Sequence, residues 1–180
     1  MTGARVYPSI ATALVLVLAG CGSSERPMLA PPAHPRTIEL GWVERSTNPA
    51  MVYRVERLVL RPDGWSADVG VENRSAADFQ IRRPHRPGDS LFGLVLLKST
   101  SKKELRELTA GFRKEPPFLD PDGIDPPLPA SLRAGSSWRG TLTGSTVLRG
   151  GTVVRMIFGR FQRHTKPRVI TWVTDHAVRL

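Results

Sequence analysis

The sequence predicts an all-β fold, an antiparallel sandwich of about seven strands, with a small β-barrel as the alternative. Apolar and polar residues alternate with a period of two, most clearly at Trp65, Ala67, Val69 and Val71. Turn residues separate such segments at short spacing, and no helical pattern long enough to cover a parallel sheet lies between them. These observations favour antiparallel strands that share one core.

The first half of the domain contains three predicted strands. Residues 38–43 supply an edge strand, and residues 52–60 and 65–72 form a hairpin across a Pro-Asp-Gly turn at residues 62–64. Arg57 falls out of phase with its apolar neighbours, which predicts a bulge in the first strand of this hairpin.

The second half adds four strands. Residues 92–97 form a continuous apolar run, which is typical of a central strand buried on both faces. Residues 137–147 alternate again. A turn at residues 149–151 leads into a strand at 153–161, and residues 169–178 form the last strand.

Two connecting segments have distinctive compositions. Residues 115–129 contain six prolines, which predicts a long surface crossover that carries the chain between the sheets. Within residues 102–108, Leu105 and Leu108 have helical spacing, but the segment is too short to be more than a loop element.

The start of the chain carries a processing signal. Its only charged residue before the cysteine is Arg5, and an apolar stretch at residues 10–19 leads to Leu18-Ala19-Gly20-Cys21. This stretch is well below the ~20 residues that a helix needs to cross a bilayer. The four residues resemble the lipobox of bacterial lipoproteins. The resemblance implies that the Cys21 thiol is alkylated with diacylglycerol and that a peptidase cuts before Cys21.

This resemblance divides the chain into three parts. Residues 1–20 are expected to be a lipoprotein signal peptide, residues 21–37 the lipidated cysteine with a flexible Pro- and Ser-rich tether, and residues 38–180 the sandwich domain. Two acyl chains give stable attachment, so we expect the protein on the extracytoplasmic face of a cell membrane, with the outer membrane as one alternative where the cell has one. A fully extended tether would reach roughly 50 Å. The alternatives are an ordinary secretory peptide with a chance cysteine, or a buried hydrophobic helix.

Two short segments suggest the subclass of sandwich. Residues 69–75 look like a strand ending in Asn-x-Ser, and residues 132–140 look like a Leu-x-x-Gly-x-x-x-x-Gly strand entry. Both resemble segments of immunoglobulin-like ectodomains of secreted bacterial proteins. The resemblance implies a domain that binds a partner or acts as a spacer. The cysteine pair of antibody-type domains is absent, because Cys21 is the only cysteine.

No catalytic, cofactor-binding or metal site is expected from the sequence. Asp120, Asp122 and Asp125 superficially resemble part of a calcium loop, but the spacing differs from that of an EF-type loop. Asp175 and His176 would point to opposite faces of a strand and so cannot orient each other. The histidines lack the close spacing of zinc ligands; they are His34, His85, His164 and His176.

The aromatic residues and one sequon have structural interpretations. Four tryptophans fall within or beside predicted strands and are expected in the core rather than on a carbohydrate-binding surface; they are Trp42, Trp65, Trp138 and Trp172. Residues 73–75 match an N-glycosylation acceptor, but in a bacterial protein they are interpreted as a turn.

Basic residues are the feature with the clearest binding potential. Removal of residues 1–20 takes away one positive charge, Arg5, so the net charge of +10 becomes +9. One group of basic residues, at residues 82–86, lies in a loop that contains prolines. We expect attraction to anionic lipid or cell-wall polymer and no nucleic-acid partner, the alternative being a solvated rim. The main cluster lies at the tip of the last hairpin and consists of Arg160, Arg163, His164, Lys166 and Arg168.

The expected function is therefore that of a non-catalytic binding or spacing module of the cell envelope. One alternative is a subunit of an envelope complex that binds another envelope protein through an exposed apolar patch. The other is an enzyme whose site is assembled from distant residues such as Asp175 and His176, which a concave pocket lined by convergent polar groups would indicate.

Overall fold

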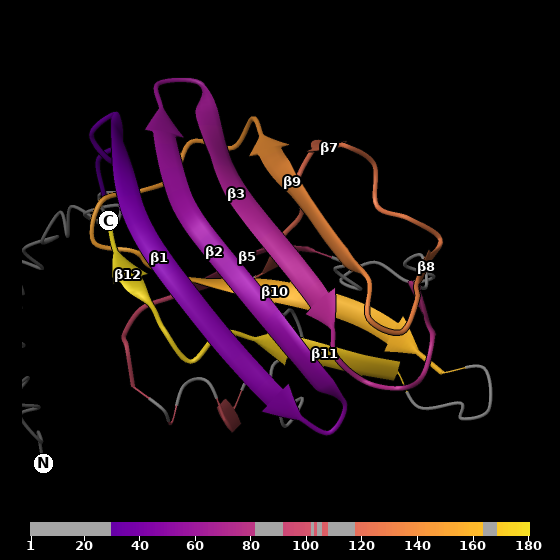
Figure 1. Ribbon diagram of the computed structural model, residues 1–180. Coiled ribbons are helices and arrows are strands. Elements are labelled where there is room, and N and C mark those ends of the chain that lie inside the picture. The colour runs from indigo at the N-terminus through magenta and orange to yellow at the C-terminus, as the bar shows by residue number, and fades with distance from the viewer. Residues whose placement is uncertain (1–29, 82–91, 102, 104–105, 108–117, 164–168) are drawn as a thin grey trace, which may run out of the picture.

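Two antiparallel sheets face each other across a hydrophobic core, and the strands of one cross behind those of the other (Figure 1). The computed structural model describes residues 30–81, 92–101, 103, 106–107, 118–163 and 169–180. The predicted all-β sandwich is confirmed.

The first sheet has the order β1-β2-β3-β9-β7. Leu60 on β2 lies opposite Trp65 on β3, which confirms the predicted hairpin. The register shifts between Val55 and Arg57, so the predicted bulge is also present, with Glu56 as the extra residue. The strands of this sheet are β1 (Arg36–Thr47), β2 (Ala50–Arg61), β3 (Gly64–Asn73), β7 (Gly123–Asp125) and β9 (Ser137–Gly144).

The second sheet has the order β6-β5-β10-β4-β8, and β11 and β12 also pair with β10. Its strands are β4 (Phe79–Ile81), β5 (Phe92–Leu97), β6 (Phe118–Leu119), β8 (Ser131–Leu132), β10 (Val153–Gln162), β11 (Val169–Val173) and β12 (Val178–Arg179).

Strand β5 is central, as its apolar run predicts. It pairs with both β10 and β6. Phe92 and Leu94 belong to the main core between the sheets, whereas Val95 and Leu97 belong to a second apolar cluster. Because successive side chains point to opposite faces, β5 is apolar throughout.

The proline-rich crossover carries the chain between the sheets, as predicted. Strand β6 pairs with β5 in the second sheet, and a few residues later β7 pairs with β9 in the first. Residues 115–117 of this segment, most of the predicted helical turn at 102–108 and the basic loop at 82–86 lie outside the described residues.

Several strand boundaries differ from the predictions. The first strand extends to Thr47 rather than to residue 43, and β9 ends at Gly144 rather than at 147. The predicted strand at residues 169–178 is two strands, β11 and β12, interrupted at residues 174–177. At this interruption the side chains of Glu44 and Arg155 bind backbone groups of residues 174–176.

The ordered domain also begins earlier than residue 38. Ala33 is buried, and its N–H donates to the carbonyl of Leu148 at 2.8 Å. The N–H of Gly150 donates to the carbonyl of Pro31 at 2.8 Å. Composition misleads here because prolines block regular pairing but do not prevent isolated contacts. Residues 30–37 therefore belong to the domain rather than to the tether.

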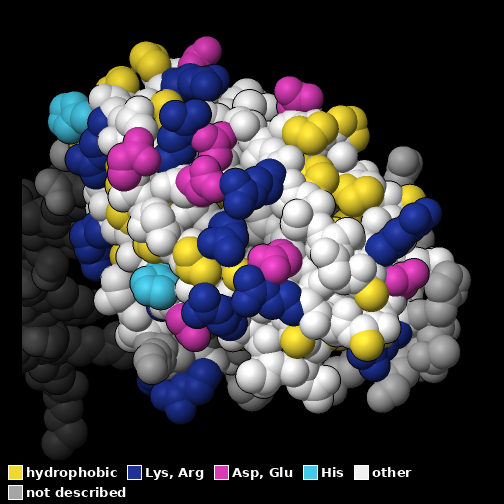
Figure 2. Space-filling view, in the orientation of Figure 1, with side chains coloured by type: hydrophobic (Ala, Val, Ile, Leu, Met, Phe, Trp, Pro, Cys, Tyr) yellow, Lys and Arg dark blue, Asp and Glu magenta, His cyan; other side chains and the backbone are white. Residues whose placement is uncertain are grey.

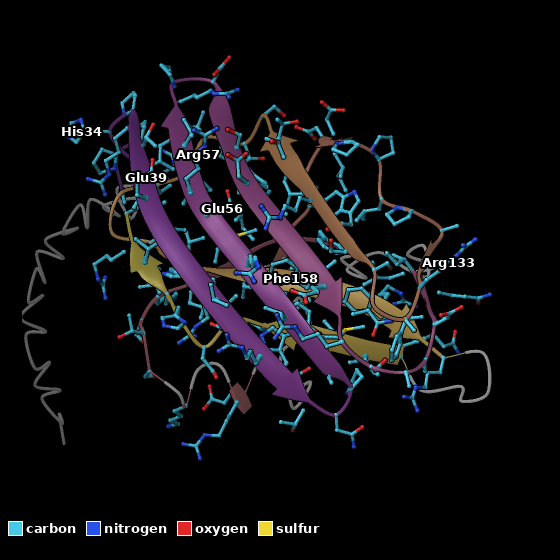
Figure 3. The ribbon with its side chains drawn as sticks, viewed as in Figure 1. His34, Glu39, Glu56, Arg57, Arg133 and Phe158 are labelled. Atoms are coloured by element: carbon cyan, nitrogen blue, oxygen red, sulfur yellow. The ribbon has the colours of Figure 1, made fainter. Side chains whose placement is uncertain are left out.

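Aromatic rings fill the core around Phe158 (Figure 3). Its ring centroid lies 5.1 Å from that of Tyr53 and 5.3 Å from that of Phe92. Trp65 and Trp138 are buried as predicted, whereas Trp42 and Trp172 are partly buried against the same core. A Cβ atom at Gly140 would lie 2.5 Å from the ring of Trp138, so only a glycine at position 140 leaves room for that ring.

Candidate functional site

Two of the five residues in the predicted basic hairpin tip are described. Arg160 and Arg163 lie at and just beyond the end of β10, whereas His164, Lys166 and Arg168 lie outside the described residues, as does Cys21. Arg160 adopts a φ of +61° within a register shift between β10 and β11. The Arg163 guanidinium lies 5.4 Å from the ring centroid of buried Phe79, so it contributes packing as well as charge.

Glu44 on β1 is a buried carboxylate with four hydrogen-bond contacts to one segment of the second sheet. Its carboxylate accepts hydrogen bonds from the Trp172 indole N–H and the Asp175 backbone N–H, each at 2.9 Å. It also accepts from the His176 backbone N–H at 2.9 Å, and His176 Nδ1 lies 2.9 Å from the same oxygen. The Glu44 side chain is 6% exposed and that of His176 is 57% exposed.

The electrostatics of Glu44 favour its charged form. Burial alone would raise the pKa of this carboxyl, but the hydrogen bonds from His176, Asp175 and Trp172 together lower it below its usual value. The carboxylate therefore remains ionised although it is buried.

Arg155 on β10 binds the backbone carbonyl groups of the same interrupted segment. This buried guanidinium donates to the Thr174 carbonyl at 2.6 Å and to the Asp175 carbonyl. Residues 174–176 thus give N–H groups to a carboxylate and carbonyl groups to a guanidinium. These bonds satisfy backbone groups that would otherwise pair in a strand.

The pairing of His176 with Glu44 has the form of an oriented acid–base pair, but its surroundings indicate a structural role. The ring of Trp42 stacks on the imidazole at a centroid distance of 5.8 Å. Two surface depressions lined by described residues lie elsewhere, and neither includes His176. The hydrogen bonds of Glu44 fix the C-terminal segment of the second sheet to β1 of the first sheet.

Sequence reasoning missed Glu44. The predicted first strand ends at residue 43, one residue before Glu44, and the acidic residue adjacent to His176 in the sequence is Asp175. A signal was nevertheless present, because residues 42, 44 and 46 alternate with exposed residues and face inward. A charged residue at an inward strand position indicates a buried polar partner.

The larger depression lies on the outer face of the first sheet and has a volume of about 300 Å³. Glu56 and Arg57, which line it, project from β2 (Figure 3). Arg57 pairs with Asp68, and Arg139 lies 3.6 Å from Glu56. Thr141 also donates to Asp68 at 2.7 Å. Four charged groups of this depression, those of Glu56, Arg57, Asp68 and Arg139, are thus already paired with one another.

The calcium-like loop and the sequon both have structural roles. The Asp122 carboxylate accepts the Ser145 backbone N–H, which lowers the pKa of Asp122. Among the described residues, no group of three His, Cys, Asp or Glu side chains could hold a metal ion. Asn73 is fully buried and donates to the carbonyls of Ala77, Leu132 and Arg133, so it joins β3 to β8.

In the described part of the chain, no helix is long and apolar enough to cross a membrane. Comparison of the chain with protein-family models, curated proteins and solved structures gives no match.

Proposed function

We propose that this protein is a lipid-anchored lipoprotein whose sandwich domain acts as a non-catalytic binding or spacing module on the extracytoplasmic face of a cell membrane. The observation that carries the proposal is Leu18-Ala19-Gly20-Cys21 at the end of an apolar stretch. Diacylglycerol on the Cys21 thiol would supply two acyl chains, enough for stable attachment.

The start of the domain supports a short tether. Ala30 accepts a hydrogen bond from Arg149, and Ala33 is buried, so contacts with the domain begin at about residue 30. Eight residues lie between Cys21 and Ala30, and even a fully extended chain across these nine steps spans only about 30 Å. The proposed anchor would therefore hold the domain close to the membrane.

The partners that we propose are anionic lipid or cell-wall polymer, or another envelope protein. Arg160 and Arg163, the described residues of the basic hairpin tip, lie at and just beyond the end of β10, whereas the first residues of the domain contact the turn that precedes β10. The ten residues of β10 span about 30 Å. The tip thus lies far from the proposed anchor, within reach of a polymer or protein beyond the membrane surface.

Replacement of Cys21 by serine tests the proposed anchor. The full-length protein is produced in bacteria that are fed a fatty acid with an alkyne tag. We expect the wild type to be labelled and Cys21→Ser to remain an unlabelled precursor, because a hydroxyl is a much poorer nucleophile than a thiolate. Ser23→Ala is the matched control and should be labelled like the wild type. Labelling of Cys21→Ser at the wild-type level would overturn the proposal.

A further inference from the structure

The end of the domain nearest the proposed anchor carries a group of exposed basic side chains, here called the attachment-end patch. It consists of His34, Arg36, Arg149 and Arg179. None of these residues belongs to the basic hairpin tip. They come from three separate parts of the chain: the segment before β1 and its first residue, the turn before β10, and the last strand.

Backbone contacts bring these parts together. The Pro32 backbone bridges to Arg149, whose guanidinium donates to the Ala30 carbonyl at 3.1 Å. The Arg179 guanidinium donates to the Gly151 carbonyl at 2.9 Å, and Val153 lies opposite Arg179 in the sheet. The patch is therefore built around the turn at residues 149–151, which is also where the chain enters the domain.

The arginines of this patch are bonded differently from those on the outer face of the first sheet. On the outer face of the first sheet, Arg54, Arg57 and Arg139 each pair with a carboxylate. In the part of the chain that the structure describes, none of the three patch arginines forms such an ion pair, and Arg149 and Arg179 donate to backbone carbonyls instead. Figure 2 shows basic side chains along the edge near His34, with acidic side chains beside them; Figure 3 labels His34 and the neighbouring Glu39.

We propose that the attachment-end patch docks on the anionic phospholipid headgroups of the bilayer that holds the Cys21 lipid. This inference rests on the proposed lipid anchor. Ala30 is tied to Cys21 by a link of at most about 30 Å, so the patch lies at the end of the described domain that this link keeps within about 30 Å of the proposed anchor. Clusters of Arg next to a membrane attachment point are attracted to anionic lipid within a Debye length.

Docking through this patch would also orient the domain. Strand β10 begins at Val153 beside the patch and runs about 30 Å toward the basic hairpin tip. With the patch on the headgroups, the domain would present the tip to the periplasm or cell wall. Lipid docking and polymer or protein binding would then use opposite ends of one strand.

The test compares two sets of charge-matched variants of the mature chain, residues 21–180, with Cys21→Ser in every protein so that no lipid contributes. Arg36→Gln, Arg149→Gln and Arg179→Gln are combined in the patch variant. Arg163→Gln, Lys166→Gln and Arg168→Gln are combined in the control variant. Binding is measured by cosedimentation with vesicles of phosphatidylcholine alone or with 30% phosphatidylglycerol, at low and high salt, and circular dichroism verifies folding.

We expect wild-type binding to require phosphatidylglycerol and to fade with salt. The patch variant should bind roughly a hundredfold more weakly and the control variant less than threefold more weakly, since each cation near the surface is worth about a fivefold change. If the patch variant unfolds, Arg36→Gln alone should weaken binding about fivefold. An equal or larger loss in the control variant, or equal binding to both vesicles, would overturn the inference.

These experiments distinguish a failure of the proposed anchor from a failure of the proposed docking surface. Loss of fatty-acid labelling in the wild type would remove the proposed anchor whatever the vesicles show. If Cys21 is labelled but vesicle binding does not depend on the patch, the proposed anchor is supported and the proposed docking surface is contradicted.

Discussion

Glu44 is the residue that ties the two sheets together at the C-terminal end of the chain. Its carboxylate accepts from two backbone N–H groups and an indole and contacts an imidazole, across more than 120 residues of sequence. Alternation predicted the burial of Trp65 because that signal is local. No local signal identifies a partner so distant in sequence, so the role of Glu44 required the structure.

Glu44→Gln should lower the free energy of unfolding by about 2 kcal/mol at pH 7, because an amide cannot accept all four contacts and its own N–H groups would face donors. Urea unfolding measures this. His176→Gln is the matched control and should cost less than about 1 kcal/mol, since its side chain is exposed. Equal losses in the two variants would show that the side-chain pair, rather than the backbone contacts, carries the effect.

The same variant has a defined pH dependence. The folded-state pKa of Glu44 is lowered, so the carboxylate stabilises the fold above its unfolded pKa of about 4.5. This contribution is lost as the pH falls through the folded pKa. The difference in stability between wild type and Glu44→Gln should therefore shrink in acid, and a difference that grows in acid would contradict this assignment.

At the scale of elements, the hairpin of β2 and β3 and its bulge could be predicted because turn residues and phase are local properties. The division of β11 from β12 could not, because Glu44 and Arg155, which bind the interruption, lie elsewhere in the chain. The start of the domain was misplaced for a similar reason: Ala33 is held by Leu148, a contact that composition does not reveal.

Truncation tests the role of residues 30–36. A chain that starts at Thr37 loses the burial of Ala33 and two backbone hydrogen bonds, to Leu148 and from Gly150. Its free energy of unfolding should be about 2–3 kcal/mol below that of a chain starting at Ala30, both measured by urea melting. Pro35→Ala, at an exposed position of the longer chain, should have little effect. Identical urea midpoints for the two chains would show that residues 30–36 do not stabilise the domain and that it begins at about residue 38.

At the scale of the whole molecule, the two-layer architecture follows from patterning, but the arrangement of charge does not. The hairpin tip was recognisable in the sequence because its cations are contiguous. The attachment-end patch was not, because its residues come from both ends of the domain and meet only at the turn before β10. The fold therefore separates two basic surfaces that composition alone would count together.

The most direct test of the central claim is the intact mass of the full-length protein after expression in bacteria and extraction from their membranes. We predict a chain that lacks residues 1–20 and carries a diacylglycerol modification localised to Cys21 by fragmentation. A chain that keeps residues 1–20, or that is cleaved but carries no lipid on Cys21, would contradict it.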